Sequence, residues 1–457
     1  SLGWWGGLTC HQPEIFRTTA NGNWTNPAIW EKKLPGGAYV SSNRIPQKGD
    51  DSIYVRHNVL LNTSILTDQV VVESNGHLRI ESPTSSFISV HSYKTKTQAE
   101  FLVHGTLTTN NFVQLFGANG FMEVKGDLAN AGKIELDSVL FTGNNPQLLG
   151  APGTKGILRH MRLSNPSGLT LQGHQEVSSI IFDQGMIQTT NQAVLTLLAE
   201  GSSHITGARN AAHINGPAGV RMFGTGERFY PIGRNGVYRP VILTNSNTST
   251  FDNDDELITE VVAGSPVSRT LPTGVNAVSS VRHYRISRIG NISSDFTITL
   301  PYGTDDGVSD PGNLTLVKDD GAGAWINLNG TASGPSPGTV VSETFNGVGD
   351  FVLANKTGGT NGLVTSLVDR MYERSNYAHL FPNPVASNLT LEIRQPRSGQ
   401  KLNIRLLDIQ GRELKKWSFA NQSTRRTLFL GDLPPGNYLL EITNDLFQKQ
   451  ITQIVKQ

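Results

Sequence analysis

Short alternating strands that open on glycine follow one another from residue 52 to about residue 198, with almost no helical periodicity between them. Alternation of apolar and polar residues predicts strands with one buried face, and the Gly, Asn and Ser residues between them predict turns. The spacing of these starts is irregular, but it is often near the roughly 20 residues of one β-solenoid coil. The glycines that begin them are Gly76, Gly105, Gly126, Gly132, Gly156, Gly168 and Gly185.

These strands predict a right-handed parallel β-helix of about six to eight coils, with alternating aliphatic residues stacked inside. Because the period is imperfect, an antiparallel sandwich remains the alternative. About seven further strand candidates lie between residues 241 and 355, a number typical of an Ig-like sandwich. The expected fold class is therefore all-β, with a parallel β-helix (solenoid) followed by β-sandwich domains.

Tryptophan is concentrated at the start of the chain, where Trp4, Trp5, Trp24 and Trp30 lie among Gly and Pro residues. This composition predicts a compact cap over the first coil. The alternative is a sugar-stacking platform, since exposed indole faces suit pyranose rings. The expected segments are a Trp-rich cap at 1–50, a β-solenoid at 51–240, an Ig-like sandwich at 241–355, a linker at 356–380 and a C-terminal sandwich at 381–457.

Composition excludes several classes of partner. The chain has 38 Lys plus Arg against 37 Asp plus Glu, a formal net charge of +1, which does not favour nucleic acid or a strongly acidic partner. No apolar run reaches the roughly 18 residues of a membrane span. The start lacks a signal peptide, and we expect Ser1 to follow a removed signal.

The single cysteine, Cys10, excludes an internal disulfide and leaves either a buried small apolar residue or an intermolecular link.

The last 77 or so residues combine four recognisable features in a fixed order. A Pro-Asn-Pro opening is followed by a D-x-x-G-R-x-L hairpin, an L-x-x-G-x-Y strand start and a final strand with basic residues. This arrangement resembles the C-terminal sorting domain of type IX secretion substrates in Bacteroidetes; an ordinary Ig-like module is the alternative. The residues that carry the features are Pro382, Asn383, Pro384, Asp408, Gly411, Gly436, Tyr438, Lys449 and Lys456.

The resemblance implies a secretion signal and does not imply a catalytic activity. Such domains are recognised by the outer-membrane translocon, after which a sortase commonly removes them and attaches the cargo to surface lipopolysaccharide. The implied location is the cell surface or the extracellular space, across the outer membrane. Residues 19–30 also resemble the opening of Bacteroidetes surface proteins, and residues 213–241 resemble their solenoid-to-sandwich junction.

Catalytic motifs are missing from the sequence. It contains no Gly-x-Ser-x-Gly, His-Glu-x-x-His or phosphate-loop pattern, and no pair of its 11 histidines has ligand spacing. Arg159, His160 and Arg162 lie together, but without the acids that a β-helix lyase needs beside them. We therefore expect no enzymatic activity.

Two acidic loops are calcium candidates, because dense oxygen ligands in a turn suit this hard cation. They carry Asp252 with Asp254, and Asp305 with Asp306. Neither fits an EF-hand loop, and solvated acidic turns are the alternative. No other cofactor is expected.

The sequence as a whole predicts an exported structural protein, either an adhesin or a self-assembling fibre or sheath subunit. Its expected partners are the type IX translocon during export and further copies of the chain. The alternative is a carbohydrate-active or glycan-binding surface protein, similar to a β-helix polysaccharide lyase, with a surface polysaccharide as its partner.

Overall fold

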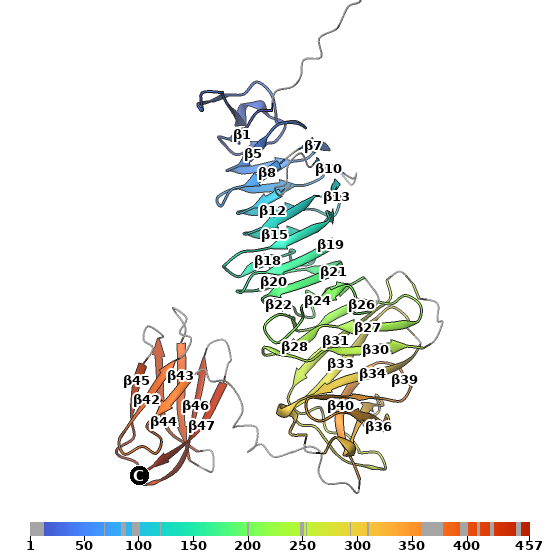
Figure 1. The fold of residues 1–457 in the computed structure, drawn as a ribbon, viewed down its shortest axis with the longest axis vertical. Helices are drawn as coiled ribbons and strands as arrows, with labels where there is room; N and C mark the ends of the chain where they lie inside the picture. Colours follow the sequence, from blue (N-terminus) through green and yellow to red (C-terminus); the bar gives the residue numbers. More distant parts are fainter. Residues whose placement is uncertain are drawn as a thin grey trace, which may run out of the picture. The chain divides into compact units, whose positions relative to one another are not determined.

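The computed structural model describes most of the chain as strands. Strands account for 58% of it and helices for 2%. It divides into two compact units, a body whose largest segment is Ser1–Pro301 and a C-terminal unit that includes Gly359–Gln457, and each is described by itself (Figure 1). The residues described are 13–67, 69–83, 88–93, 101–118, 120–198, 201–246, 251–252, 254–292, 294–308, 310–357, 378–393, 401–408, 412–420, 425–444 and 449–457.

The body begins as a parallel β-solenoid of about eight turns, which confirms the predicted fold class. Parallel pairing of successive coils excludes the antiparallel alternative for this segment. One face is an eleven-stranded sheet, parallel except for its last pair, β28 and β29. Its strands are β2 (Gly22–Asn23), β6 (Asn58–Leu61), β9 (His77–Ile80), β12 (Thr106–Thr109), β15 (Asp127–Asn130), β18 (Gln147–Leu149), β20 (Leu169–Leu171), β22 (Ile187–Gln188), β25 (Ile214–Asn215), β28 (Ile232–Arg234) and β29 (Val237–Tyr238).

The other face consists of two rows of short strands that merge into longer ones. In the middle of the solenoid, β19 pairs with strands of both rows, and β21 then pairs with β23 and β24. The first row contains β1 (Phe16–Thr18), β5 (Ser52–Val55), β8 (Gln69–Val72), β11 (Phe101–Val103), β14 (Phe121–Val124) and β17 (Ser138–Phe141). The second row and the merged part contain β7 (Ile65–Thr67), β10 (Ile88–Tyr93), β13 (Val113–Ala118), β16 (Lys133–Glu135), β19 (Lys155–Ser164), β21 (His174–Gln184), β23 (Leu195–Leu197), β24 (Ile205–Thr206) and β26 (Ala218–Arg221).

Glycines at one corner of the solenoid allow neighbouring coils to approach closely. A Cβ atom on Gly126 would lie 1.9 Å from the carbonyl oxygen of Gly105, and one on Gly105 would lie 2.2 Å from that of Gly76. Such distances are far below van der Waals contact, so a side chain at these positions would push the coils apart. The glycine-led starts seen in the sequence are therefore a requirement of coil stacking.

Two groups of buried amide side chains align the coils from within. In the first, Asn130 accepts a hydrogen bond from the Thr109 hydroxyl at 2.7 Å and donates to Gln175 at 3.1 Å. In the second, Asn165 donates to the Gln147 carbonyl oxygen at 2.9 Å. All four amides are almost completely buried. Since a buried polar group is costly without its partner, these contacts fix which coil positions face each other.

The first coil is covered by an antiparallel hairpin and an aromatic cluster. Strand β1 pairs with β3 (Trp30–Lys33), which pairs in turn with β4 (Tyr39–Ser41), and η1 (Pro27–Ile29) precedes them. Trp24 and Trp30 are buried with ring centroids 4.9 Å apart. The solenoid was expected to begin at residue 51. Strands β1 and β2 lie before that residue, but they already pair with β5 and β6 of the next coil.

A β-sandwich continues directly from the last coil. Strand β26 pairs in parallel with β23 of the solenoid and antiparallel with β31 of the sandwich. The expected boundary at residue 240 is not a clean one, because β27 belongs to a sandwich sheet while β28 and β29, which follow it, complete the solenoid. The sandwich elements are β27 (Gly226–Tyr230), β30 (Val241–Asn245), β31 (Glu256–Ala263), β32 (Val275–Val278), β33 (Arg282–Ile289), β34 (Asp295–Tyr302), η2 (Thr304–Asp306), η3 (Pro311–Asn313), β35 (Leu314–Asp319), β36 (Trp325–Asn327), β37 (Thr331–Ser333), β38 (Gly338–Val341), β39 (Phe345–Asn346) and β40 (Gly349–Lys356).

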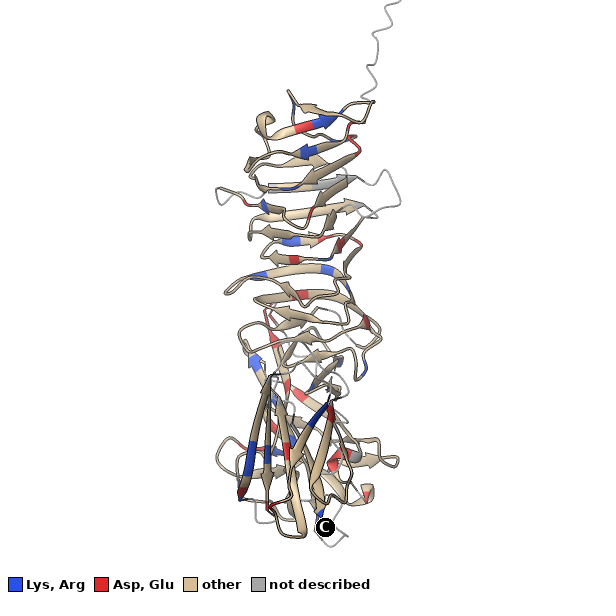
Figure 2. Cartoon of the chain, turned by 90° about the vertical axis from the view of Figure 1, so that its left-hand side faces the viewer, with Lys and Arg blue, Asp and Glu red and all other residues tan. Residues whose placement is uncertain are grey.

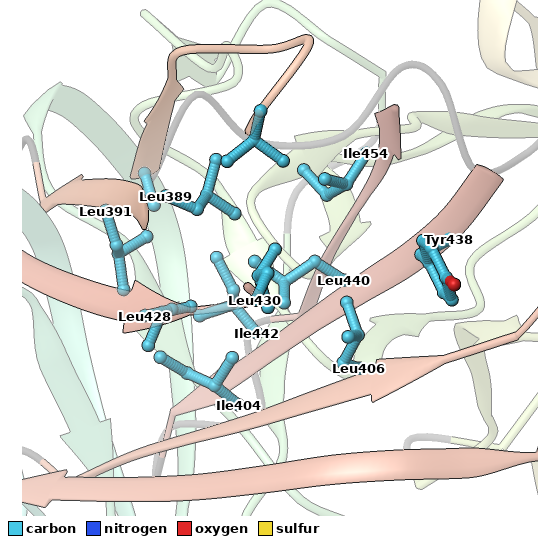
Figure 3. Close-up of a cluster of buried hydrophobic side chains, with 12 residues drawn as sticks. Leu389, Leu391, Ile404, Leu406, Leu428, Leu430, Tyr438, Leu440, Ile442 and Ile454 are labelled. Carbon is cyan, nitrogen blue, oxygen red and sulfur yellow. The ribbon is translucent and has the colours of Figure 1, made fainter. Parts of the chain in front are cut away.

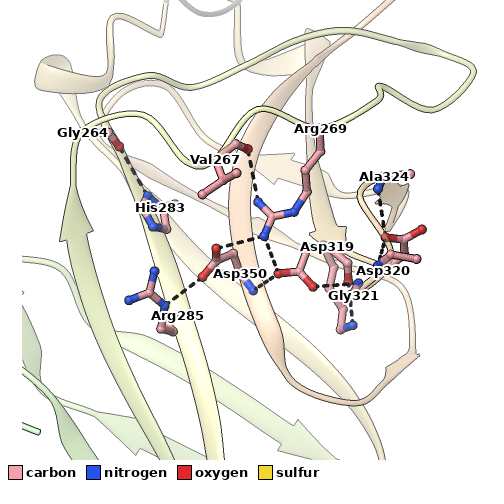
Figure 4. Close-up of polar contacts among 12 residues, drawn as sticks. Gly264, Val267, Arg269, His283, Arg285, Asp319, Asp320, Gly321, Ala324 and Asp350 are labelled. Carbon is pink, nitrogen blue, oxygen red and sulfur yellow. Dashed lines mark hydrogen bonds and ion pairs between the residues drawn. The ribbon is translucent and has the colours of Figure 1, made fainter.

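An ion-pair network holds the loop between β31 and β32 against the sandwich (Figure 4). Arg269 contacts Asp319 at 3.1 Å and Asp350 at 3.4 Å, and its guanidinium lies 4.6 Å from the centre of the Trp325 ring. Arg285 reaches Asp350 from the next strand at 3.1 Å.

Figure 2 shows charges of both signs interspersed along the body. No helix in the described part of the chain is long and apolar enough to cross a membrane.

The C-terminal unit is a sandwich of a three-stranded and a four-stranded sheet. In the described part of this unit, apolar side chains and Tyr438 from both sheets form a buried cluster (Figure 3). The three-stranded sheet has the order β41 (Ala378–Phe381), β42 (Asn388–Ile393), β45 (Arg425–Phe429). The four-stranded sheet has the order β44 (Glu413–Ala420), β43 (Lys401–Leu407), β46 (Gly436–Asn444), β47 (Lys449–Lys456).

Candidate sorting-signal site

Asn383 ties the start of the C-terminal domain to its last strand. It lies between β41 and β42, and the peptide bonds before Pro382 and Pro384 are both cis. Its side-chain amide donates to the carbonyl oxygen of Gln453 at 2.8 Å and accepts from the N–H of Val455 at 2.8 Å. A side-chain amide offers the same donor and acceptor as a peptide group. Asn383 therefore occupies the place of a strand residue beside β47.

Val385 completes this contact through its backbone. Its N–H donates to the carbonyl oxygen of Val455 at 2.8 Å, and its own carbonyl oxygen accepts from the N–H of Gln457 at 3.0 Å. The Val385 side chain is fully buried in the core. Sequence reasoning did not assign this residue a role; an apolar residue directly after the Pro-Asn-Pro opening was the available signal. Residues 383–385 form a clip that covers the end of β47, and we call them the β47 clip.

Tyr438 and Lys456 lie near the same end of the four-stranded sheet. The Tyr438 ring packs in the core and its hydroxyl donates to the carbonyl oxygen of Pro434 at 2.8 Å. Gly436 is paired with Lys456, whose ammonium donates to the carbonyl oxygen of Gln457. A Cβ atom on Gly436 would come no nearer than 3.8 Å to the Tyr438 ring. Space alone therefore does not require glycine at this position.

Asp408 closes the hairpin between β43 and β44. Its carboxylate accepts from the N–H of Arg412 at 2.9 Å and from the Arg412 guanidinium at 2.7 Å. Strand β43 ends at Leu407, opposite Leu439, so this turn lies at the same end of the sheet as Gly436. Gly411, predicted as part of the same motif, lies outside the described residues.

The structure thus brings most of the predicted signal residues to one end of the four-stranded sheet. Lys449 is the exception among those described, because it is paired with Thr443 at the opposite end. The shared location follows from the register of the strands, which places the end of β47 beside the start of β46. It was not evident from the positions of the motifs in the sequence.

An ion pair that sequence reasoning missed lies on the outer face of this sheet. The Arg405 guanidinium donates twice to one carboxylate oxygen of Glu441, at 2.9 and 2.7 Å. Glu441 is only 6% exposed although it points away from the core, because Arg405 covers it. The hydrogen bond with Glu441 raises the pKa of Arg405. Opposite charges on facing positions were the only signal, and the register was needed to see it.

In each acidic loop at least one carboxylate has a contact within the chain. Asp254 forms an ion pair with Arg221 at 3.0 Å, and the N–H of Asp252 donates to Asp255 at 2.8 Å. Asp306 accepts from the N–H of Gly303 at 2.8 Å, and Asp305 lies beside it in η2. In the described ranges, no group of three or more His, Cys, Asp or Glu side chains is placed to hold a metal ion. Calcium binding at these loops stays a prediction.

The other predicted site residues belong to the body or lie outside the described residues. Arg159 is exposed on β19, where His160 contacts the Ser179 hydroxyl at 2.7 Å and Arg162 contacts Asp183 at 2.6 Å. The buried rings of Trp24 and Trp30 cannot stack on a sugar in this conformation. Trp4, Trp5 and Cys10 lie outside the described residues.

Comparisons with known proteins give one match to this domain. Residues 379–457 match the family described as the secretion system C-terminal sorting domain. No curated protein matches the chain. A solved structure, dimeric latent PorU from Porphyromonas gingivalis, is similar at 13% identity over 48% of this chain and 24% of that chain, with a TM-score of 0.16.

The C-terminal unit is therefore a β-sandwich of the sorting-domain class, and most of the residues predicted to carry the signal lie at one end of a sheet. It marks the chain as a type IX secretion substrate, as the sequence predicted. The protein is exported across the outer membrane to the cell surface or the extracellular space.

Proposed function

We propose that the exported chain is a structural protein of the cell surface, an adhesin or a subunit of a surface assembly, and that it is not an enzyme. In this proposal the body is a rigid stalk and the C-terminal domain serves export. The observation that carries the proposal is strand β26, which is shared by the solenoid and the sandwich. Because a continuous ladder of backbone hydrogen bonds crosses the junction, the two parts cannot hinge there without breaking it.

The buried amides support the same role. They hold neighbouring coils in one register, and the hairpin of β3 and β4 covers the first coil. A stack of coils with a fixed register transmits force along its length. Because its first coil is covered, no further coil can pair at that end. These features favour a load-bearing element over a flexible tether.

Glycan binding is the second candidate, and a row of outward side chains favours it. Tyr54, Val71 and Leu102 occupy facing positions on β5, β8 and β11, although Val71 is only 8% exposed. The row then continues through Glu123, Leu140, Arg162 and Ile181. Ile181 is 42% exposed. Neighbouring strands lie about 4.8 Å apart, so the row follows the stacking direction and could support an extended polysaccharide.

A cell-based experiment tests the structural role. Cells that lack the gene for this protein are compared with cells that regain the wild-type chain or a chain without residues 13–357 but with its sorting domain. We expect adhesion to surfaces, or an ordered surface layer seen by electron microscopy, to return only with the wild-type chain. Full recovery with the shortened chain would contradict the proposal.

A binding and turnover assay separates the second candidate from the first. Purified full-length protein is titrated with uronate polysaccharides, and unsaturated product is followed by absorbance. The structural role predicts no turnover. Turnover that disappears in Arg159→Ala would establish an enzyme instead, and binding that disappears in Tyr54→Ala without turnover would establish a glycan-binding protein.

A further inference from the structure

The last strand of the C-terminal domain has a long edge that its own chain covers only in part. Strand β47 ends the four-stranded sheet and pairs with β46 on one side. On its other side, the β47 clip bonds the backbone of Gln453, Val455 and Gln457. Clip contacts therefore reach the C-terminal part of this edge and stop at Gln453.

Backbone alternation shows what remains open. Successive residues of a strand direct their N–H and C=O groups to opposite sides, so every second residue faces the same edge. Since residues 453, 455 and 457 face away from β46, residues 449 and 451 do so too. Within the ranges that the structure describes, no other strand pairs with these two residues on that side. An unpaired strand edge of this kind is a template for another strand.

The remaining strand edges of the domain are less suited to pairing. Edge strand β44 carries Lys415 and Lys416, and edge strand β45 carries Arg425 and Arg426. Adjacent like charges oppose the approach of a second identical edge. Strand β41 is only four residues long. Strand β47 has eight residues, as β44 does, but its open stretch has one charged residue, Lys449.

We propose that the open edge of β47 binds the same edge of a second copy of this chain. The open stretch consists of the outward-facing residues Lys449 and Ile451, because the carbonyl oxygen of Gln453 already accepts from Asn383 of the β47 clip. Antiparallel pairing about a two-fold axis places Ile451 opposite Ile451 and Lys449 opposite Gln453. Each copy then fills the whole open stretch of the other, and no like charges face each other.

This geometry makes Ile451 to Ile451 a hydrogen-bonded pair, in which each residue donates its N–H and accepts at its C=O. The two four-stranded sheets join into one continuous sheet, the arrangement known from other edge-to-edge complexes. Because the axis is two-fold, the contact closes at a dimer and does not propagate as a filament. The inference does not depend on the structural role proposed above.

Proline at residue 451 tests the contact selectively. The N–H of residue 451 points away from β46, so its loss leaves the β46–β47 ladder intact, whereas it removes a donor from the proposed pair. Ile451→Lys is a second variant, which places like charges opposite each other at the axis. Ile451→Val keeps both the backbone and an apolar β-branched side chain and is the matched control.

Sedimentation equilibrium of the full-length chain across the micromolar range gives the readout. The wild type and Ile451→Val are expected to approach twice the chain mass of 49.5 kDa, whereas Ile451→Pro and Ile451→Lys stay at that mass. Far-UV circular dichroism checks folding, and Ile451→Lys decides the matter if the proline variant unfolds. A monomeric wild type would overturn the inference, as would unchanged association in folded Ile451→Lys.

Discussion

In the solenoid, buried amide side chains align neighbouring coils, whereas the C-terminal domain aligns its strands around an apolar core and places its polar contacts at the periphery. Asn130 and Gln175 are completely buried in the first case. In the second, Asn383 is exposed and its two hydrogen bonds lie at a sheet edge. Register errors are therefore opposed most strongly in the body, where every misplaced amide would lose its partner in a dry environment.

The comparison also separates what each part requires to fold. Coil stacking demands the absence of side chains at fixed corners, and the sandwich demands only apolar residues on one face of each strand. Apolar cores tolerate substitutions that preserve volume, but two backbones in direct contact leave no space for an added side chain. Substitutions in the two regions should therefore differ in how much they lower the free energy of unfolding.

The largest effect is expected from Gly126→Ala. The added Cβ would lie 1.9 Å from the Gly105 carbonyl oxygen, and the backbone on both sides is held in the stack. We expect the free energy of unfolding of the body to fall by about 3–5 kcal/mol, measured by urea denaturation. Gly36→Ala is the control, because nothing lies within 4 Å of its added Cβ. Equal small losses for both variants would contradict the close-stacking argument.

Asn130→Leu is expected to come next. The substitution removes the acceptor for Thr109 and the N–H of Gly132, and it removes the donor to Gln175. With buried partners left without hydrogen bonds, a loss of about 2–4 kcal/mol follows. Gln114→Leu on the outward side of β13 is the matched amide control and should change stability by less than about 0.5 kcal/mol. A neutral Asn130→Leu would show that the amides do not set the register.

Asn383→Ala should have a smaller effect and confine it to the C-terminal domain. Two hydrogen bonds at a partly exposed sheet edge are lost, which corresponds to about 1–2 kcal/mol. The chain is also expected to reach the cell surface less efficiently, as measured by surface labelling of intact cells. Asn388→Ala, an exposed residue at the start of β42, is the control. Unchanged stability would remove the β47 clip as an element of the site.

The smallest effect is expected in how the stability of the body depends on pH, through Glu256 at the junction between solenoid and sandwich. Burial raises the pKa of Glu256, and the neighbouring Glu176 adds to the shift. The folded state then binds a proton more readily than the unfolded state, so this group's contribution to stability falls as pH rises above the ordinary value of 4.5. Glu256→Gln can still accept from the Thr196 hydroxyl and should flatten the stability profile above pH 4.5. A profile identical to wild type would refute the shift.

Some of these features could be predicted from the sequence and others could not. Gly126 and the other corner glycines indicate coil starts in the sequence, because each is required by the close approach of two coils at its own position. The partnership of Asn130 with Gln175 spans 45 residues and depends on how many coils lie between them, which an irregular period does not reveal. Strand β27 shows the same limit, since alternation identifies a strand but not the sheet that it joins.

The C-terminal site shows a similar division. The sorting-domain resemblance was recognised from the order of its motifs, and the family match at residues 379–457 agrees with that resemblance. Their convergence at one sheet end could not be predicted, because Asn383 meets Gln453 across 70 residues of sequence. Val385 and the Arg405–Glu441 pair were missed because their roles depend on pairing partners rather than on residue type.

Differential scanning calorimetry of the full-length protein tests the contrast between the two regions most directly. Because each region has its own means of aligning strands, we predict two separable transitions. Asn130→Leu should lower only the transition of the body, and Asn383→Ala only that of the C-terminal domain. A single shared transition, lowered by both substitutions, would contradict the account.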